Sequence, residues 1–109
     1  MPAYRVILRM QVIDGLGAGF EAAWRDGADV IGREPANLGQ WLSRSDSEPG
    51  VYYIVSDWVD EPSFRAYETS ERHRLHRAAL HPYRSGGSMS TTHLLAAVPG
   101  AAVGAGAVR

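Results

Sequence analysis

The sequence of 109 residues predicts an α+β fold, in which one antiparallel sheet of four strands carries helices on one face. Three observations support this prediction. Four stretches show the polar–apolar alternation, or the β-branched and aromatic content, that is typical of strands. Two other regions place apolar residues at helical spacing. The order along the chain is strand, helix, strand, strand, helix, strand, and this β-α-β-β-α-β order defines the ferredoxin-like fold.

Each element begins or ends at a recognisable signal. Gly32 and Pro35 end the first helix. Asp60 offers an N-cap oxygen to the second helical region, and Pro62 falls in its first turn, where a missing N–H costs nothing. Ser70 interrupts this region and is a candidate cap for a second helical segment. The predicted elements are strands at residues 4–12, 37–44, 51–58 and 88–98, one helix at residues 18–33, and a long helical region between Asp60 and His81.

Composition is that of a single globular domain. Residues 1–98 form the predicted domain, and the Gly/Ala-rich residues 99–109 predict a disordered tail. A net charge of −1 argues against nucleic acid or an anionic membrane as a partner. The absence of cysteine excludes disulfides and thiolate chemistry, and no apolar run approaches a membrane span. Because the first residues lack the apolar core of a signal peptide, we expect a cytoplasmic protein.

Alternate residues of the third strand form the predicted wall of a pocket. Strand residues of one parity share a face, and the even-numbered residues here include most of the aromatic side chains. An aromatic wall with a few polar groups suits a flat apolar ligand. The predicted lining is Tyr52, Ile54, Ser56 and Trp58 of the strand, with Phe64, Tyr67 and His73 of the helical region.

The other parity of the sheet carries large side chains that the helices cannot cover. Tyr53 and Val55 of the third strand and Trp41 of the second fall on this face. Leu38, Gln40 and Leu42 of the second strand share the other face, on the helix side. A homodimer packed sheet to sheet buries such residues. We therefore expect a homodimer, and the alternative is that these residues stay partly exposed.

Three histidines fall in or just after the helical region, at His73, His76 and His81. Three imidazoles are enough for a zinc or iron site, but their spacing is not that of HExxH. Arginines at positions 72, 74 and 77 also disfavour a bound cation, so we expect no metal. Either His73 or His76 faces the sheet as a proton acceptor, or both are packing histidines.

The residues around the third strand form a recognisable pattern. The strand ends in Ser56-Asp57-Trp58, an acidic corner follows at Asp60-Glu61, and then come Phe64 and the step from Ser70 to His73. This pattern resembles the antibiotic biosynthesis monooxygenase (ABM) family. The segments FEAAW and NLGQWLSR are also similar to the family, and the resemblance covers about residues 4–98.

The resemblance implies that two ferredoxin-like chains pair into a dimeric α/β barrel. The best-known members oxidise aromatic polyketide phenols or anthrones to quinones with O₂ and with no flavin, haem or metal. We therefore expect a cofactor-independent monooxygenase of antibiotic or pigment biosynthesis, with an aromatic polyketide, O₂ and a second copy of the chain as its partners. Haem is not expected, because the haem-degrading branch places its histidine closer to the tryptophan than His73.

The expected catalytic residues are His73 or His76 as the base and Tyr67, which with Tyr52 is a candidate to orient the phenolic oxygen. Polyketide oxygenases of the family carry an Asn and a Tyr at the positions of Ile54 and Phe64 in this chain. Two alternatives therefore stay open, a polyketide cyclase of the same fold and a non-catalytic binding module.

Overall fold

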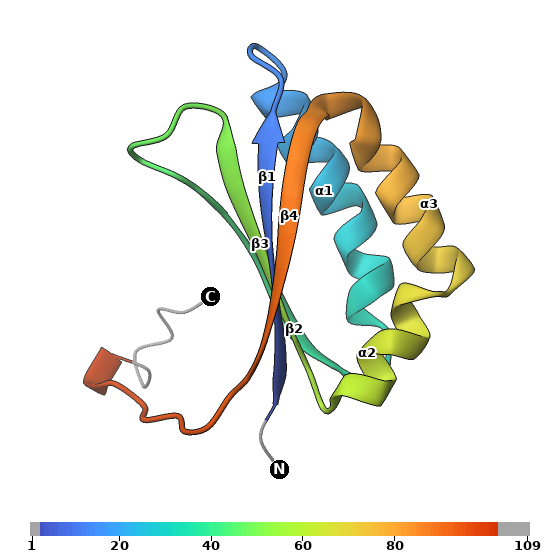
Figure 1. Ribbon diagram of the computed structural model, residues 1–109, viewed down its shortest axis with the longest axis vertical. Coiled ribbons are helices and arrows are strands. Elements are labelled where there is room, and N and C mark those ends of the chain that lie inside the picture. The colour runs from blue at the N-terminus through green and yellow to red at the C-terminus, as the bar shows by residue number, and fades with distance from the viewer. Residues whose placement is uncertain (1–2, 103–109) are drawn as a thin grey trace.

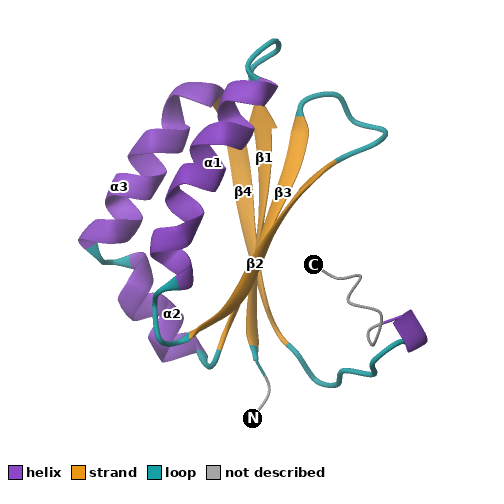
Figure 2. Ribbon diagram, turned by 180° about the vertical axis from the view of Figure 1, so that it is seen from behind, coloured by secondary structure: helices purple, strands orange, loops and turns teal. Residues whose placement is uncertain are grey.

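The computed structural model describes residues 3–102 and confirms the predicted order of elements (Figure 1). The strands form one antiparallel sheet in the order β2-β3-β1-β4, so β2 and β4 are its edges. All three α-helices lie against one face of this sheet (Figure 2). The elements are β1 (Tyr4–Val12), α1 (Gly17–Gly32), β2 (Asn37–Arg44), β3 (Val51–Trp58), α2 (Glu61–Glu68), α3 (Glu71–Leu80), a 3-10 turn (His81–Tyr83) and β4 (Arg84–His93).

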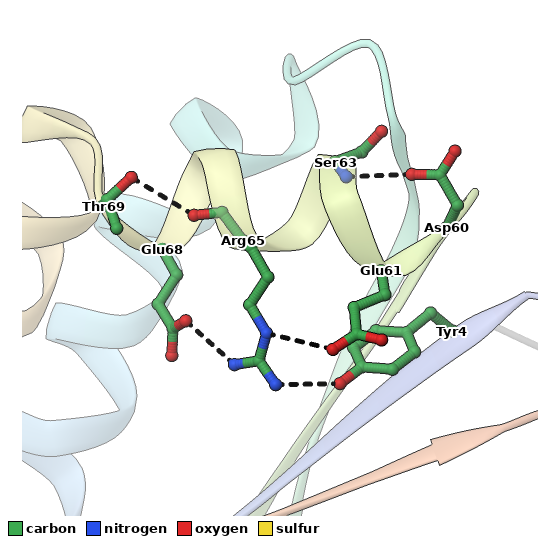
Figure 3. Close-up of polar contacts among 7 residues, drawn as sticks. All are labelled: Tyr4, Asp60, Glu61, Ser63, Arg65, Glu68 and Thr69. Carbon is green, nitrogen blue, oxygen red and sulfur yellow. Dashed lines mark hydrogen bonds and ion pairs between the residues drawn. The ribbon is translucent and has the colours of Figure 1, made fainter.

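The helical region after β3 divides into two helices, α2 and α3, at the predicted interruption. Asp60 Oδ1 accepts a hydrogen bond from the Ser63 backbone N–H at 2.9 Å and caps α2 (Figure 3). Ser70 Oγ accepts from the His73 N–H at 3.3 Å and caps α3. Each cap satisfies a backbone donor that a helix leaves free at its first turn. Both caps predicted from the sequence are therefore confirmed.

The fourth strand differs from its prediction. β4 spans Arg84–His93 rather than residues 88–98, because Gly86 and Gly87 do not form a bend but pair with Gln11 and Met10 of β1. At the other end, His93 is paired with Tyr4, the first residue of β1, so the ladder ends there. A last bond runs from the Leu94 N–H to the Ala3 carbonyl at 2.8 Å. The partner strand, not the local composition, sets both ends of β4.

A bulge in β2 also changes the predicted faces. Asn37 pairs with Trp58 and Gly39 with Asp57, so Leu38 is an extra residue in the ladder. Leu38 is consequently 57% exposed instead of lying on the helix side with Leu42. Beyond the bulge the predicted parity holds, and Trp41 lies opposite Val55 on the face away from the helices.

The segment after β4 leaves the sheet on the side opposite the helices (Figures 1 and 2). Its residues 99–102 are exposed, and Leu95 and Val98 are exposed as well. The rest of the predicted disordered tail, residues 103–109, lies outside the described residues, as do residues 1–2. In the part of the chain that the structure describes, no helix is both long enough and apolar enough to cross a membrane.

The core between the sheet and the helices consists of two clusters of buried side chains. One gathers around Trp58 and Phe64, at the end of the sheet where α2 begins. The other gathers around Phe20 and Ile54, under α1. Leu8, in the middle of β1, packs against both clusters. The space next to Leu8 is not fully filled, and this is where the cavity of the next section lies.

Candidate functional site

A cavity of about 340 Å³ lies between the helix-facing side of the sheet and the three helices. Its volume is within the range of small-molecule binding sites. Apolar side chains of β1, among them Leu8 and Met10, form its floor. Seven of the eight predicted site residues line it: Ile54, Ser56, Trp58, Phe64, Tyr67, His73 and His76. The structure thus brings these seven side chains together around one cavity.

Tyr52 is the exception and does not line the cavity. Its hydroxyl donates to Glu21 Oε2 at 2.6 Å, and its ring packs 5.0 Å from the ring of Phe20. The hydrogen bond to Glu21 is the main reason that the pKa of Tyr52 is raised, with burial adding to it. Tyr52 has the predicted parity, but it lies at the opposite end of β3 from Trp58 and fills the second core cluster. Tyr52 therefore lies outside the cavity whose wall it is predicted to form.

Trp58 forms the aromatic wall at one end of the cavity. It is 1% exposed, and its ring stacks on Tyr67 with centroids 5.0 Å apart and planes at 24°. Phe64 packs against the other rings, 5.6 Å from Trp58. The Trp58 indole N–H donates to Ser56 Oγ at 3.0 Å. That donor is thus used within the protein, and the Ser56 hydroxyl keeps its own proton for another acceptor.

Gln40 is a polar residue of the cavity wall that the sequence places on the helix side but that is not among the predicted site residues. It lies directly opposite Ser56 in the β2–β3 ladder, on the helix-facing side. Its Nε2 donates to the Ala28 carbonyl of α1 at 2.6 Å, which fixes the amide plane. A glutamine on the otherwise apolar face of an edge strand was the available signal, because such a position normally favours an apolar side chain.

His76 and His73 bring two imidazoles to the cavity from α3. Burial lowers the pKa of His76, and the neighbouring His73 lowers it further. Burial also lowers the pKa of His73, which Glu68 partly offsets. Since the ordinary histidine pKa is about 6.5, both rings are neutral at neutral pH and can accept a proton.

Gly27 of α1 makes room for His76. A Cβ built on Gly27 overlaps His76 Nδ1 and Cε1, so a larger residue there must displace the ring. The edge of the imidazole that carries Nδ1 therefore faces α1. The glycine therefore leaves the space that the ring occupies.

Tyr67 is the third predicted catalytic residue, and its hydroxyl is buried. Burial raises the pKa of Tyr67 to about 12, and the carboxylate of Glu34 adds to the rise. The hydroxyl is therefore a proton donor at neutral pH and not a base. The ring also touches His73 edge to face, with centroids 5.3 Å apart.

Three buried side-chain donors have no hydrogen-bond partner within residues 3–102: Trp24 Nε1, Tyr67 Oη and Arg84 Nε. All three belong to residues of the cavity wall. Buried donors are almost always paired in folded proteins, so a cluster of unpaired ones requires a reason. A bound ligand with several oxygen acceptors would supply one.

A network of hydrogen bonds around Arg65 fixes the α2 side of the cavity (Figure 3). Arg65 Nη1 donates to Glu68 Oε1 at 3.0 Å and Nη2 donates to the Tyr4 hydroxyl at 3.1 Å. Its Nε is 3.4 Å from Glu61 Oε2. The network connects α2 to β1 and neutralises Glu68, which lines the cavity. Across residues 3–102, no group of three His, Asp or Glu side chains is placed to hold a metal ion.

Comparison with known proteins connects this architecture to a family. The family model described as antibiotic biosynthesis monooxygenase matches residues 3–79. Protein SchA of Streptomyces halstedii is 30% identical over 82 residues, which are 75% of this chain and 22% of SchA. The chain thus spans about a fifth of the length of this relative.

Solved structures share the fold. SnoaB of Streptomyces nogalater, described as a cofactor-independent oxygenase, superposes with a TM-score of 0.80 and 20% identity over 92% of this chain and 100% of SnoaB. A protein of Caulobacter crescentus superposes with a TM-score of 0.79 and 23% identity, over 87% of this chain and 92% of that protein. At these identities the likeness concerns the fold, and both structures have the sheet and helices described above.

Proposed function

The chain belongs to the antibiotic biosynthesis monooxygenase family, and on that premise we propose that it oxidises a polycyclic phenol or anthrone of aromatic polyketide origin to a quinone. The proposed oxidant is O₂, and the proposed reaction needs no flavin, haem or metal. SnoaB, which has the same fold, is described as a cofactor-independent oxygenase. The observation that carries the proposal is the pairing of an aromatic-walled cavity with two histidines that burial keeps neutral.

The proposed chemistry begins with a proton transfer. His76 or His73 accepts a proton from the phenol or from the acidic methylene of the anthrone, and the resulting anion is electron-rich enough to reduce O₂. The carbon then forms a C–O bond to oxygen, and the imidazolium returns its proton to give a hydroperoxide. Loss of the second methylene hydrogen with cleavage of the O–O bond yields the quinone carbonyl and one water. One oxygen atom of O₂ thus enters the product and the other leaves as water.

The rest of the wall orients the substrate and excludes water. Trp58 and Tyr67 present stacked rings against which a flat polycycle packs. The Tyr67 and Ser56 hydroxyls are donors for a phenolic or carbonyl oxygen, because neither is ionised at neutral pH. Ile54 and Phe64 contribute apolar surface where related oxygenases are expected to have polar groups, so the polar contacts come from the other side chains.

An oxygen electrode tests the proposal. Chelator-treated protein with no flavin absorbance is mixed with 1,8-dihydroxyanthrone, and O₂ uptake is followed together with quinone absorbance. We expect protein-dependent uptake of one O₂ per quinone formed, unchanged by added chelator. Uptake at the rate of the uncatalysed background, or uptake that requires a restored metal, contradicts the proposal.

A polyketide cyclase is the second candidate. The apolar side chains of Ile54 and Phe64 favour it, because they replace the polar residues expected in the oxygenases. Such an enzyme uses the same histidine to remove a proton between two carbonyls and promotes an aldol closure. Product formation from a poly-β-ketone under strict anaerobiosis distinguishes a cyclase from both an oxygenase and a binding module.

We also propose that the chain forms a homodimer through the sheet face opposite the helices. Trp41 is 44% exposed on this face, and Tyr53 and Val55 are half-buried beside it. The segment after β4, which contains the exposed Leu95 and Val98, also leaves the sheet on the side opposite the helices. Burial of these apolar groups favours association. Light scattering at micromolar concentration that gives the mass of a monomer contradicts this proposal.

A further inference from the structure

Arg84 lies at the first position of β4, and its side chain lines the cavity. A Cβ built on Gly87 lies 2.8 Å from Arg84 Nη2 and 3.1 Å from Met10 Sδ. Gly87 pairs with Met10, which is on the helix-facing side of the sheet, so the guanidinium lies over Gly87 on that side. The glycine therefore leaves the space that the arginine occupies. Two residues together hold one cation at the wall of the cavity.

This cation has no carboxylate partner within residues 3–102. Arg5, Arg9, Arg44, Arg65, Arg72 and Arg74 each form an ion pair with an Asp or Glu. Within the described ranges, four arginines form none, Arg25, Arg33, Arg77 and Arg84, and of these Arg77 and Arg84 line the cavity. Arg84 Nε is also buried without a hydrogen-bond partner. The cavity wall thus differs from the rest of the surface, where arginines are mostly paired.

The charges of the wall do not balance. Glu68 is its acidic residue, and Arg65 Nη1 already donates to it at 3.0 Å. The two histidines are neutral and contribute no compensating charge. A partly buried cation with an unused donor is costly unless an anion accepts from it. The unmatched charge therefore favours an anionic group on the bound molecule.

We propose that Arg84, with Arg77 near the opening, binds a carboxylate of the substrate, so that the ligand is an aromatic carboxylic acid and not a neutral polycycle. A planar guanidinium matches a carboxylate through two parallel hydrogen bonds. Arg77 is exposed and Arg84 is half-buried, so the carboxylate stays near solvent between α3 and β4. The rings then extend toward Trp58 and the histidines. This inference rests on the proposed function for the identity of the rings.

Binding of two matched ligands tests the inference. Anthraquinone-2-carboxylate and anthraquinone-2-carboxamide have the same rings and differ in charge, and neither reacts with O₂. Titration calorimetry of the full chain at pH 7.5 is expected to give an affinity for the acid at least about tenfold higher than for the amide. Equal affinities of the wild-type protein for the two ligands overturn the inference without any variant.

Two variants assign the preference to Arg84. Arg84→Gln is expected to bring the two affinities within about threefold of each other while leaving amide binding intact. Arg84→Lys keeps the charge but loses the planar fork, so its acid preference lies between those of the wild type and Arg84→Gln. Arg74→Gln is the matched control, because Arg74 is exposed on α3 and paired with Glu71. An undiminished preference in both Arg84 variants overturns the assignment.

The result is separable from the test of the proposed function. Preference for the acid together with background O₂ uptake supports the carboxylate site and contradicts the oxygenase. Protein-dependent O₂ uptake with equal affinity for acid and amide supports the oxygenase and contradicts the carboxylate site.

Discussion

Neighbouring residues of β3 face two different environments. On the helix-facing side, Ser56 lies in the wall of a cavity whose polar groups are partly unpaired. On the other side, Asp57 is 7% exposed and accepts two hydrogen bonds from Arg5, at 2.7 Å from Nε and 2.8 Å from Nη2. The nearby Arg9 is paired with Glu48 at 2.9 Å. One face of β3 thus borders a cavity whose other walls hold the unpaired donors, and the opposite face carries the paired charge of Asp57.

The two faces show that polar side chains serve two purposes in this small domain: some pair with each other, and others have no partner within the protein. On the face opposite the helices, here called the open face, the paired charges satisfy each other's hydrogen bonds. The large side chains on this face, such as Trp41, remain available for packing. On the helix side, the donors of Trp24 and Tyr67 are buried without protein acceptors, which lowers stability in the empty protein. Unpaired groups of this kind are expected where a ligand, not the protein, provides the partner.

Removal of the largest side chain on each face gives the strongest contrast. Trp58→Ala leaves a cavity beside Tyr67 and Phe64, and we expect it to lower the free energy of unfolding by about 3–5 kcal/mol. Trp41→Ala on the open face is the matched control and is expected to cost less than about 1 kcal/mol in the monomer. Urea unfolding at protein concentrations low enough for light scattering to show a monomer measures both. Equal losses contradict the distinction between a buried wall and an uncovered face.

The next largest effect is expected when the histidine base on the helix-facing side is removed. His76→Gln and His73→Gln keep a polar side chain, and the one that removes the base is expected to lower kcat/KM by about a hundredfold. Wild-type kcat/KM rises with pH as the histidine loses its proton. Because burial lowers the pKa of both histidines, the midpoint of this rise lies below the ordinary value of about 6.5. Full activity in both variants rules out a histidine base.

The same histidines predict the direction of acid destabilisation. Their pKa values are lower in the folded than in the unfolded chain, so the unfolded chain binds more protons as the pH falls below about 6.5. Their contribution to stability is therefore present above that pH and decreases as the pH falls toward the folded-state pKa values. Urea unfolding between pH 5 and 8 measures the trend, and it is expected to be weaker in the double variant His73→Gln/His76→Gln.

On the open face, the ion pair between Asp57 and Arg5 is compared with the histidines of the helix-facing side. Asp57→Asn removes a charge-assisted bidentate contact, and we expect a loss of about 1–2 kcal/mol, because the Arg5 side chain is 37% exposed and solvent offsets part of the cost. Oxygen uptake at saturating substrate is expected to stay at the wild-type level. A loss of activity that exceeds the loss of folded protein contradicts the assignment of the active site to the helix-facing side of the sheet.

The smallest effect is expected for Trp58→Phe. The substitution keeps an aromatic ring and removes the indole donor to Ser56 Oγ, which is a loss of about 1 kcal/mol. Since the donor is used within the protein, turnover is expected to change only through the orientation of Ser56. Thermal unfolding measures the loss of stability, and O₂ uptake measures turnover. Loss of turnover with unchanged stability indicates that the indole contacts the substrate directly.

The sequence predicted those parts of the fold that depend on local pattern. β2 and β3 have the predicted bounds and α1 is shifted by one residue, because their periodicity and end signals are strong. β4 was misplaced because Gly86 and Gly87 are typical of a bend, yet pairing with β1 keeps them in the strand. The exposure of Leu38 results from the register between β2 and β3, which a single sequence does not specify.

The candidate site was predictable only as far as it depends on the alternation of residues along one strand. Parity along β3 identified Ile54, Ser56 and Trp58, and it failed at Tyr52 because parity gives the face but not the position along the strand. Arg84 was missed because its long side chain reaches the cavity over Gly87, a contact between β4 residues that depends on the strand pairing.

Two serine-to-phenylalanine substitutions test the central claim, that the helix-facing side of the sheet is the active face. Ser56→Phe puts a ring into the cavity, whereas Ser43→Phe puts the same ring beside Tyr53 on the exposed face of β2. The measurement is O₂ uptake with 1,8-dihydroxyanthrone by each folded variant. Ser56→Phe is expected to lower the uptake to background, and Ser43→Phe to keep it near the wild-type rate. Full uptake by Ser56→Phe, or an equal loss in both variants, contradicts the claim.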